Sequence, residues 1–291
     1  MIILQLLPLT ARRCYNKLHI MQSKFLKKYR YSLILLRELV ITEFKLRYQG
    51  STLGYLWSLL KPLFTFIILY LVFVFFLRIG SDIPHWPVAL LLGIVLWNFF
   101  AEVTNNGLGA IVGRGDVIRK INFPKYVIVI ASSISAFINL LLNLIVIGVF
   151  MAISGVGLSL SALLSPLFII EIFIFAIGLA LILSALYVRL RDLNYIWEII
   201  MQALFYASAV IYPISIVLDQ STQIAKLILM NPVSQAIQDT RHVLINENNP
   251  TLYTITDNLL WYLIPVAIVV VTTFVGVLIF KKRSPYFAEN I

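Results

Sequence analysis

The sequence has one cysteine, three histidines and few charged residues. Cys14 has no partner for an internal disulfide, and one thiolate cannot supply a cysteine-based metal site. The histidines lie in separate segments without a shared helical spacing, so no histidine-based metal or catalytic site is predicted. Charged residues make up 12% of the 291 residues, which is too few for the surface of a water-soluble domain of this size.

A phosphate-binding loop is also missing. No GxxxxGKS or GxxxxGKT pattern occurs in the chain, so we expect no ATP site on this polypeptide. The glycine-rich stretch GLGAIVGRG, residues 107–115, has GxGxxxG spacing and follows an apolar run rather than a strand, which disfavours a dinucleotide site. We therefore predict no catalytic residue, no metal and no cofactor on this chain.

Apolar residues, by contrast, dominate the sequence. They make up 60% of it, and the mean hydropathy is +0.93. Six runs reach the length of about 20 residues that a helix needs to cross a bilayer. The fold class is therefore an all-α integral membrane protein with six transmembrane helices within residues 50–283 and a cytoplasmic tail at 284–291. The predicted spans are residues 58–79, 86–107, 125–152, 163–187, 194–216 and 259–280.

The net charge of +10 is distributed as membrane topology requires. If the N-terminus is cytoplasmic, 20 of the 23 Lys and Arg residues lie on the inner side, and only Arg78, Lys226 and Arg241 lie outside. This is the positive-inside pattern, so we expect a multi-pass protein of the cytoplasmic membrane with both termini inside. The basic residues would contact lipid headgroups, and nucleic acid is not an expected partner.

The segment before the first span divides into two parts. Residues 1–23 form an N-terminal extension, with Met21 as an alternative start. Residues 24–49 predict an amphipathic helix at the cytoplasmic interface, with one apolar stripe through Leu33, Leu36 and Val40 and a second through Leu35 and Leu39. Two apolar faces favour contact with another subunit, and a simple anchor lying on the membrane is the alternative.

The chain must then turn sharply to enter the bilayer. Gly54 permits the backbone angles of such a turn, Trp57 suits the headgroup depth, and Pro62 falls in the first turns of the next helix. The motif RYQGSTLGYLWSLLKP, which runs from Arg47 and Tyr48 to Pro62, resembles the membrane entry of ABC-2 type permeases that export O-antigen, teichoic acid and capsular polysaccharides.

Further motifs extend this resemblance over most of the chain from residue 37 to 283. GRGDVIRKINFPK at 113–125 is similar to the family's coupling segment, and RLRD at 189–192 is similar to its basic turn. Tyr212 and Pro213, then Asn231, Pro232 and Arg241, resemble its external segment. The resemblance implies a homodimer of permease subunits with a separate pair of ATP-binding subunits, which would hold ATP and magnesium. The expected substrate is a lipid-linked cell-surface polysaccharide.

We assign coupling to the ATPase to the two cytoplasmic segments, with Asp116 expected to cap a short helix that offers apolar side chains to the partner. For the first segment, the alternative is a solvated basic loop. For the second, the alternative is that Asp192 caps the next helix and the two arginines contact lipid headgroups. The candidate coupling residues are Asp116, Val117, Ile118, Arg119, Lys120, Ile121, Arg189, Arg191 and Asp192.

A conduit for sugars needs aromatic rings and neutral polar groups along its wall. Three helical stripes fit this description, although lipid-facing aromatics and hydrogen bonds between helices explain them as well. The channel-lining candidates are Phe66, Tyr70 and Phe73; Ser132, Ser135, Asn139 and Asn143; and Gln202, Phe205 and Tyr212, with Glu198 on the same face.

Two further features stand apart from these stripes. Glu171 lies alone within the fourth span, where a charge is costly, so it is a functional candidate or a protonated carboxyl in a helix contact. Residues 231–245 predict a short amphipathic helix at the outer leaflet, with Arg241 available to a lipid phosphate. An ABC-2 exporter of a drug or small lipid is the alternative function. An ion-coupled transporter would need paired intramembrane charges or broken helices in two repeated halves, and no such repeat is evident. A membrane transferase would need a cluster of carboxylates, histidines or metal ligands at one membrane face, and Glu102, Asp116 and Glu198 are too scattered to form one.

Overall fold

The computed structural model describes residues 32–43, 45, 54, 56–80, 83–121, 123–157, 159–256 and 258–291, with only the backbone of Leu259. Within these ranges the chain forms helices and no strand, which confirms the predicted all-α class. The predicted elbow residues Arg47 and Tyr48 lie outside the described residues, as does the N-terminal extension 1–23.

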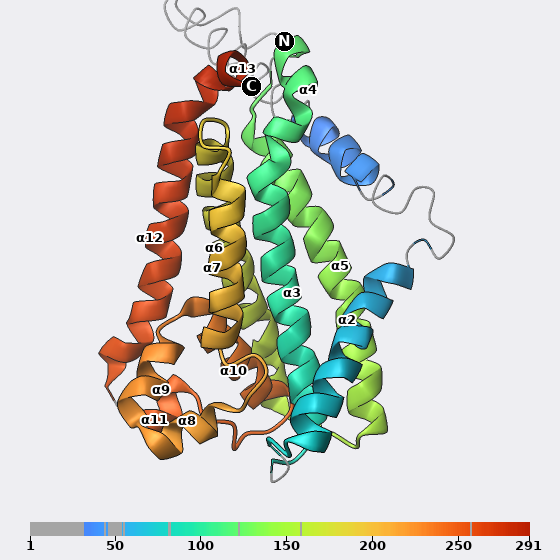
Figure 1. Cartoon of the computed structure of the whole chain (residues 1–291), viewed down its shortest axis with the longest axis vertical. Coiled ribbons are helices and arrows are strands. Elements are labelled where there is room, and N and C mark those ends of the chain that lie inside the picture. Colours follow the sequence, from blue (N-terminus) through green and yellow to red (C-terminus); the bar gives the residue numbers. More distant parts are fainter. Residues whose placement is uncertain are drawn as a thin grey trace, which may run out of the picture.

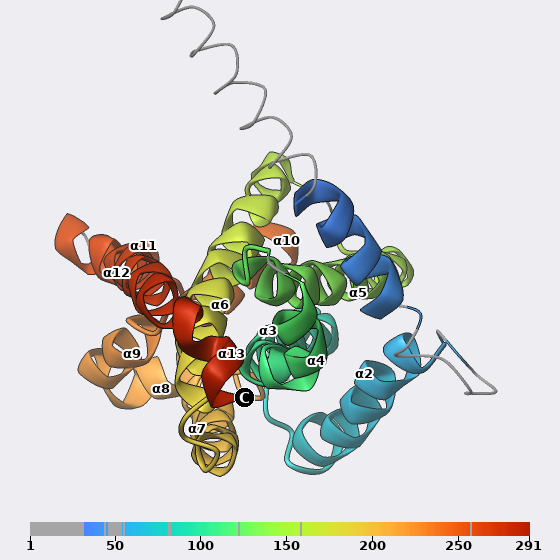
Figure 2. The same ribbon diagram turned by 90° about the horizontal axis from the view of Figure 1, so that it is seen from above.

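Long helices run roughly along one direction and form the body of the molecule (Figure 1). They are α2 (Leu56–Leu69), which continues as the π-helix η2 (Tyr70–Phe76), α3 (Trp86–Ala110), α5 (Tyr126–Ile153), α6 (Ser165–Tyr187) and α12 (Leu259–Arg283). Seen from above, α3 lies between α5, α6 and α2, and α2 leans away from the others (Figure 2). The apolar surface of α3 is accordingly mostly buried.

Shorter helices gather at the two ends of this body (Figure 1). One end, called here the α4 end, carries η3 (Val112–Arg114), α4 (Gly115–Lys120), η5 (Ser284–Tyr286) and α13 (Phe287–Asn290). The opposite end, the α10 end, carries α8 (Ile214–Gln220), α9 (Thr222–Leu229), α10 (Pro232–Leu244) and α11 (Leu252–Ile255). The short helix η4 (Leu160–Leu164) leads into α6 and packs against α10.

Five helices in the described residues are long and apolar enough to cross a membrane. The predicted count of six is therefore not reproduced, because the predicted fifth span at 194–216 is interrupted. Helix α7 (Leu193–Ala207) begins as predicted but ends after 15 residues. At 1.5 Å per residue it spans about 22 Å, less than the hydrocarbon core of about 30 Å.

Tertiary hydrogen bonds explain why α7 stops. Ala209 adopts a left-handed backbone conformation with φ of 50°, and Pro213 cannot donate a helix hydrogen bond. The guanidinium of Arg241 donates from Nη1 to Ala209 O at 3.0 Å and from Nη2 to Val210 O at 2.6 Å, so these carbonyls are satisfied outside a helix. Backbone without its own helix bonds is tolerated at membrane depth only where such partners exist.

The prediction that Arg241 is available to a lipid phosphate is therefore wrong. Arg241 is 1% exposed, its Nε donates to Ala89 O of α3 at 2.9 Å, and its guanidinium lies 5.0 Å from the centre of the Trp86 ring. Burial lowers the pKa of Arg241 to about 9, which still leaves the side chain charged at neutral pH. Arg241 thus joins α10, α3 and the break after α7.

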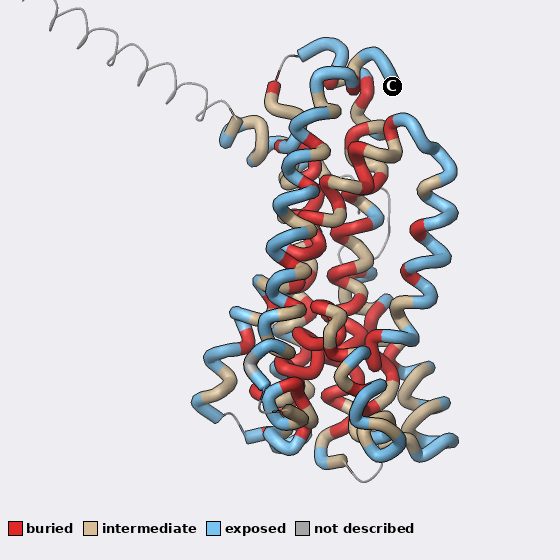
Figure 3. Tube along the Cα trace, turned by 90° about the vertical axis from the view of Figure 1, so that its left-hand side faces the viewer, coloured by how far each residue is buried: buried red, intermediate tan, exposed pale blue. Residues whose placement is uncertain are grey.

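Aromatic and small side chains hold the long helices together. Phe99, Phe137 and Phe173, from α3, α5 and α6, pack with ring centres 5.0–6.0 Å apart. Helices α6 and α12 approach closely at Gly178 and Gly276, where a Cβ on either residue would collide with the other helix. Buried residues follow the central helices and form a dense group at the α10 end (Figure 3).

Residues 32–43 are helical and pack beside the body. Leu35 and Leu39 contact the core, whereas Leu33 is 63% exposed. Glu43 forms an ion pair with Arg114 of η3 at 3.5 Å. Leu35 and Leu39 thus face the chain's own body and Leu33 faces outward, whereas Leu36 and Val40 of the same stripe as Leu33 are partly buried.

Candidate functional site

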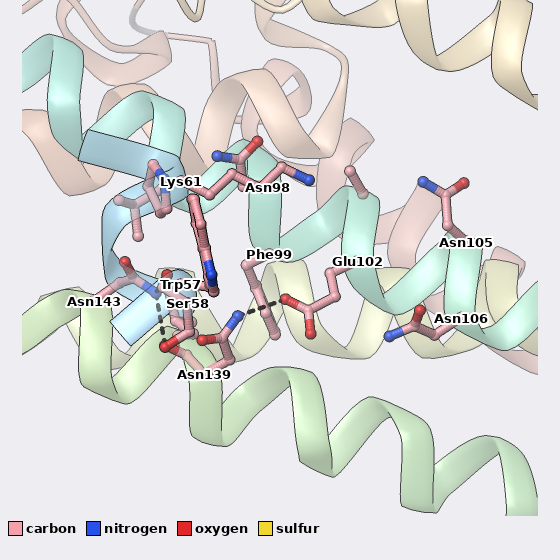
Figure 4. Close-up of a pocket in the computed structure, with 14 residues that line it drawn as sticks. Trp57, Ser58, Lys61, Asn98, Phe99, Glu102, Asn105, Asn106, Asn139 and Asn143 are labelled. Atoms are coloured by element: carbon pink, nitrogen blue, oxygen red, sulfur yellow. Dashed lines mark hydrogen bonds between the residues drawn. The ribbon is translucent and has the colours of Figure 1, made fainter. Parts of the chain in front are cut away.

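A cavity of about 570 Å³ lies between α2, α3 and α5 (Figure 4). Trp57 and Lys61 reach it from the first two turns of α2, which starts after the turn at Gly54, where φ is 48°. Pro62 follows within the same helix. The cavity is lined by Trp57, Ser58, Lys61, Pro62, Val95, Asn98, Phe99, Ala101, Glu102, Asn105, Asn106, Asn139, Leu140 and Asn143.

Polar side chains of α3 and α5 meet across this cavity. Asn139 donates from Nδ2 to Glu102 Oε2 at 2.8 Å. Asn143 donates from Nδ2 to the carbonyl of Asn139 at 2.9 Å and to the carbonyl of Ser58 at 3.3 Å, which connects α5 with α2. These bonds fix the amides and the carboxylate in place before any ligand arrives.

The arrangement suits a ligand with many hydroxyl groups. Each asparagine amide can donate two hydrogen bonds and accept others, and a carboxylate accepts from neighbouring hydroxyls. Trp57, which is 46% exposed, offers a flat ring on which the apolar face of a sugar can stack. Lys61 and Glu102 carry the opposite charges of the lining, so the cavity does not strongly favour an ion of one sign.

The structure divides the predicted stripe on the third span. Asn139 and Asn143 line the cavity. Ser132 and Ser135 are 1% and 0% exposed and lie in helix packing instead, with the Ser132 hydroxyl donating to Val129 O at 2.9 Å. Sequence reasoning missed the polar face of α3, although its spacing is helical and could have revealed it. That face consists of Asn98, Glu102, Asn105 and Asn106.

The aromatic stripe predicted on the first span lies away from this cavity. Phe66 is 9% exposed and packs against Phe150 of α5 with ring centres 6.1 Å apart and against Tyr70 at 5.8 Å. Phe73 lies in η2 and contacts the core. The roles of these residues in lining a channel stay predictions.

The stripe predicted on the fifth span is split by the end of α7. Gln202 and Glu198 are exposed on α7. Phe205 packs on Trp97 of α3 with ring centres 5.6 Å apart. Tyr212 lies beyond the break, and its hydroxyl donates to the carbonyl of Tyr206 at 2.9 Å. A single helical face through these residues does not exist, because Tyr212 lies in the non-helical segment after α7.

The predicted coupling helix is present as α4, with two corrections. Asp116 lies inside its first turn, and the N-cap position belongs to Arg114, so Asp116 is not the cap. Of the expected outward apolar side chains, Ile118 is 4% exposed within the core and Val117 packs against it. Only Ile121 projects, with 43% exposure. Asp116, Arg119 and Lys120 are exposed as well.

The C-terminal tail braces this region. Lys125, at the start of α5, donates from Nζ to Ser284 O at 2.6 Å and lies 5.9 Å from the centre of the Phe287 ring. Phe287 is 2% exposed. Ile291 lies so close to Gly115 of α4 that a Cβ there would collide with it. The predicted tail at 284–291 thus folds against the helix to which coupling is assigned.

The basic turn before α7 lies at the same end. Arg189 lines a cavity of about 340 Å³ together with Arg283 and Tyr286 of the tail region. Arg191 lies 5.4 Å from the centre of the Tyr187 ring. Asp192 occupies the N-cap position of α7, but its side chain accepts no capping hydrogen bond. The tail therefore links the two segments to which coupling is assigned.

At the α10 end, Asn231 and Pro232 start α10 as their types predict. The Asn231 Oδ1 accepts from the Val233 N–H at 3.1 Å, its Nδ2 donates to Ser208 Oγ at 2.9 Å, and Pro232 is the first helical residue. The same asparagine therefore caps α10 and fixes the chain just after α7.

Comparisons with known proteins agree with this architecture. The sequence profile of the ABC-2 type transporter family matches residues 34–245. An O-antigen export system permease protein RfbA of Klebsiella pneumoniae is 30% identical over 90% of this chain and 98% of its own length. A protein of the same name from Myxococcus xanthus is 28% identical over 88% of this chain and 95% of its own length.

Proposed function

Since this chain belongs to the ABC-2 type transporter family, we propose that it is the membrane subunit of an ABC exporter for a lipid-linked cell-surface polysaccharide. The observation that carries the substrate class is the cavity between α2, α3 and α5, with five asparagines, a glutamate and Trp57 in its lining. The relatives named for O-antigen export support the same class.

The chemistry of the cavity favours sugars over an apolar drug. Small-molecule sites for drugs are lined mostly by hydrophobic and aromatic side chains with few polar groups. Here five neutral amides line the cavity, and they can exchange hydrogen bonds with successive hydroxyls as a chain slides past. Cargo with many hydroxyl groups is therefore preferred to a drug or small lipid.

The α4 end would face the cytoplasm. It carries the basic residues of α4, of the turn before α7 and of the end of α12, whereas Arg241 at the α10 end is buried and inward-facing. The positive-inside rule then orients the chain in the cytoplasmic membrane, with its C-terminus inside. The membrane entry before α2 would begin on the same side.

ATP hydrolysis would take place on separate subunits that dock at the α4 end and hold ATP and magnesium. Ile121, which directly follows α4, offers an exposed apolar side chain beside the charged groups of that helix, which suits a contact with a partner protein. Two copies of this chain with two ATP-binding subunits would form the complete exporter.

The direct test is to purify the tagged chain from its host in mild detergent and to measure the mass and composition of the complex. A complex of two copies with two ATP-binding subunits is expected. Depletion of the chain should then cause lipid-linked glycan to accumulate on the inner side of the membrane. A complex without an ATP-binding protein, or depletion without such accumulation, would contradict the proposal.

Exchange of Ile121 for aspartate is expected to weaken docking of the ATP-binding subunit about tenfold or more without loss of the folded chain. The buried apolar contact with the partner would be replaced by a charge, whereas Ile121 contributes little to the chain's own core. Co-purification of the two subunits measures the effect. Ile118→Asp is the comparison, because it places a charge in the chain's own core and should reduce the amount of folded protein. Equal docking by wild type and Ile121→Asp would exclude Ile121 from the interface.

A further inference from the structure

Two carboxyl groups lie near each other between α6 and α10, with Asp239 buried and Glu171 partly buried. Glu171 lies in α6, and Asp239 lies in α10 one turn after Gln235. Gln235 donates from Nε2 to Asp239 Oδ2 at 2.6 Å, and its amide also interacts with Glu171. Asp239 is 5% exposed and Gln235 is 9% exposed. The amide therefore lies between the two carboxyl groups, away from solvent.

Hydrogen-bond donors are too few at this place. Glu171 Oε1, Gln235 Oε1 and Asp239 Oδ1 are buried, and none has a hydrogen-bond partner among the described residues. One amide supplies at most two N–H donors for the four oxygens of two carboxyl groups. An acceptor left unpaired away from water is unfavourable, and two buried charges of the same sign are more so.

The basic side chains of the surrounding helices are engaged elsewhere. The guanidinium of Arg241 points to α3 and to the break after α7. His242 contacts the Asn249 carbonyl at 2.9 Å through Nδ1, and Lys226 of α9 lies 5.5 Å from the centre of the Trp261 ring. No described contact therefore brings a side-chain cation to Glu171 and Asp239.

The remaining titratable groups on the packed elements do not supply positive charge either. Glu102 of α3 accepts from Asn139 far along the helix. Tyr253 of α11 faces Asp239 and Glu247, and the hydroxyl of Tyr262 of α12 donates to the Thr256 carbonyl at 2.6 Å. Within α6 itself, Glu171 is the one charged residue, and η4 contains none.

We propose that Glu171, Gln235 and Asp239 form a binding site for a single proton, which the two carboxyl groups share. A proton taken from solvent onto one carboxylate oxygen turns an acceptor into an O–H donor. This group can donate to the other carboxyl or to Gln235 Oε1, so one bound proton removes a negative charge and supplies a missing donor. The inference is independent of the cargo that the exporter carries.

The protonation of this site would determine how stably α10 packs against α6. Helix α10 carries not only Gln235 and Asp239 but also Arg241 and Gln238, both of which hold the Ala209 carbonyl after α7. Loss of the proton would leave two negative charges between α6 and α10, which repel each other. The stability of the packing of α10, and of the non-helical segment after α7 that α10 holds, then depends on pH.

The direction of the pH dependence follows from Asp239. Burial raises the pKa of Asp239 in the folded protein to about 6, above the ordinary value of 3.8. The folded state therefore binds the proton more tightly than the unfolded state. The stabilisation is fully present below pH of about 4 and is lost as the pH rises through about 6.

The experiment measures the apparent unfolding temperature of the detergent-purified full chain, with its partner subunits, between pH 5 and pH 8 in sodium-free buffer. The wild type is expected to unfold roughly 3 °C or more lower at pH 8 than at pH 5. In Glu171→Gln and in Asp239→Asn this difference should fall by at least half, because a single remaining carboxyl can no longer share a proton with a second. Asp219→Asn, an exposed carboxyl in α8, is the matched control and should behave as wild type.

Two results would overturn the proposal. One is the same pH dependence in wild type, Glu171→Gln and Asp239→Asn. The other is stabilisation of the wild type at pH 8 by sodium chloride but not by choline chloride, together with loss of this effect in Glu171→Gln. That result would mean that the three oxygens hold a metal ion instead of a proton. If the variants do not accumulate in cells, infrared spectroscopy of the wild type provides the test. A band of a protonated carboxyl group is expected at pH 5 and should diminish at pH 8. Absence of this band at pH 5 would contradict the proposed site.

Discussion

Replacement of Arg241 by alanine is expected to lower the free energy of unfolding by about 4 kcal/mol or more. Three main-chain carbonyls, of Ala89, Ala209 and Val210, lose their charged donor, although Ala209 keeps the amide of Gln238. Each hydrogen bond from a charged group contributes about 1.5–3 kcal/mol. The measurement is the fraction of monodisperse protein that survives a series of heating temperatures in detergent. Little Arg241→Ala protein should survive at temperatures where the wild type is intact.

Two comparisons isolate the role of this side chain. Arg78→Ala removes an exposed arginine and should leave the unfolding temperature within about 1 °C of wild type. Arg241→Lys should recover only part of the loss, because one ammonium cannot reproduce the planar fork of a guanidinium. Arg241→Ala with the heat resistance of wild type would show that the three carbonyls are satisfied by other donors.

The same contact can be tested from the opposite side through Gly93 of α3. A Cβ at Gly93 would collide with Arg241 Nη2 and lie 3.2 Å from the Val210 carbonyl oxygen, whereas a Cβ at Gly109 of the same helix would meet nothing within 4 Å. Gly93→Ala should therefore destabilise the chain by about 1–3 kcal/mol. Gly109→Ala should be neutral or slightly stabilising. Equal stability of the two variants would contradict the close approach of α3 to Arg241.

Replacement of both Asn98 and Asn106 by leucine is expected to reduce polysaccharide export about 30-fold. The reason is that two amides that face the cavity would no longer exchange hydrogen bonds with the passing sugar. At about 1 kcal/mol for each neutral hydrogen bond, two lost bonds correspond to roughly this factor in rate. The readout is cell-surface polysaccharide at matched levels of the permease.

The control for this experiment is Asn248→Leu, which changes an exposed asparagine in the loop after α10. It should export at the wild-type rate. ATP hydrolysis by the assembled complex should continue in the double variant, because the lining of the cavity includes no residue of α4. Undiminished export by the double variant at equal expression would remove the cavity from the sugar path.

Local patterns predicted the elements that depend on local forces. Hydropathy located the apolar helices to within a few residues, because burial in lipid is a property of a run of about 20 residues. The amphipathic pattern predicted a helix over residues 231–245, and the observed start at Asn231 and Pro232 is also local, because a cap and a first-turn proline act within three residues. The family resemblance from the entry motif and later motifs is confirmed by the match over residues 34–245.

Contacts between distant residues decided the rest. Arg241 donates hydrogen bonds to Val210, Ala209 and Ala89, which precede it in the chain by 31, 32 and 152 positions. These bonds hold the chain after α7 out of a helix, where hydropathy alone predicts a continuous span. Ile118 turned inward because the core and the C-terminal tail lie beside α4. The cavity joins Trp57, Glu102 and Asn139 from three helices. The sequence by itself determined a membrane protein of apolar helices, because lipid acts on each segment separately. Only the tertiary structure decided which polar groups meet inside it, because each buried polar group is stabilised by a partner far away in the chain.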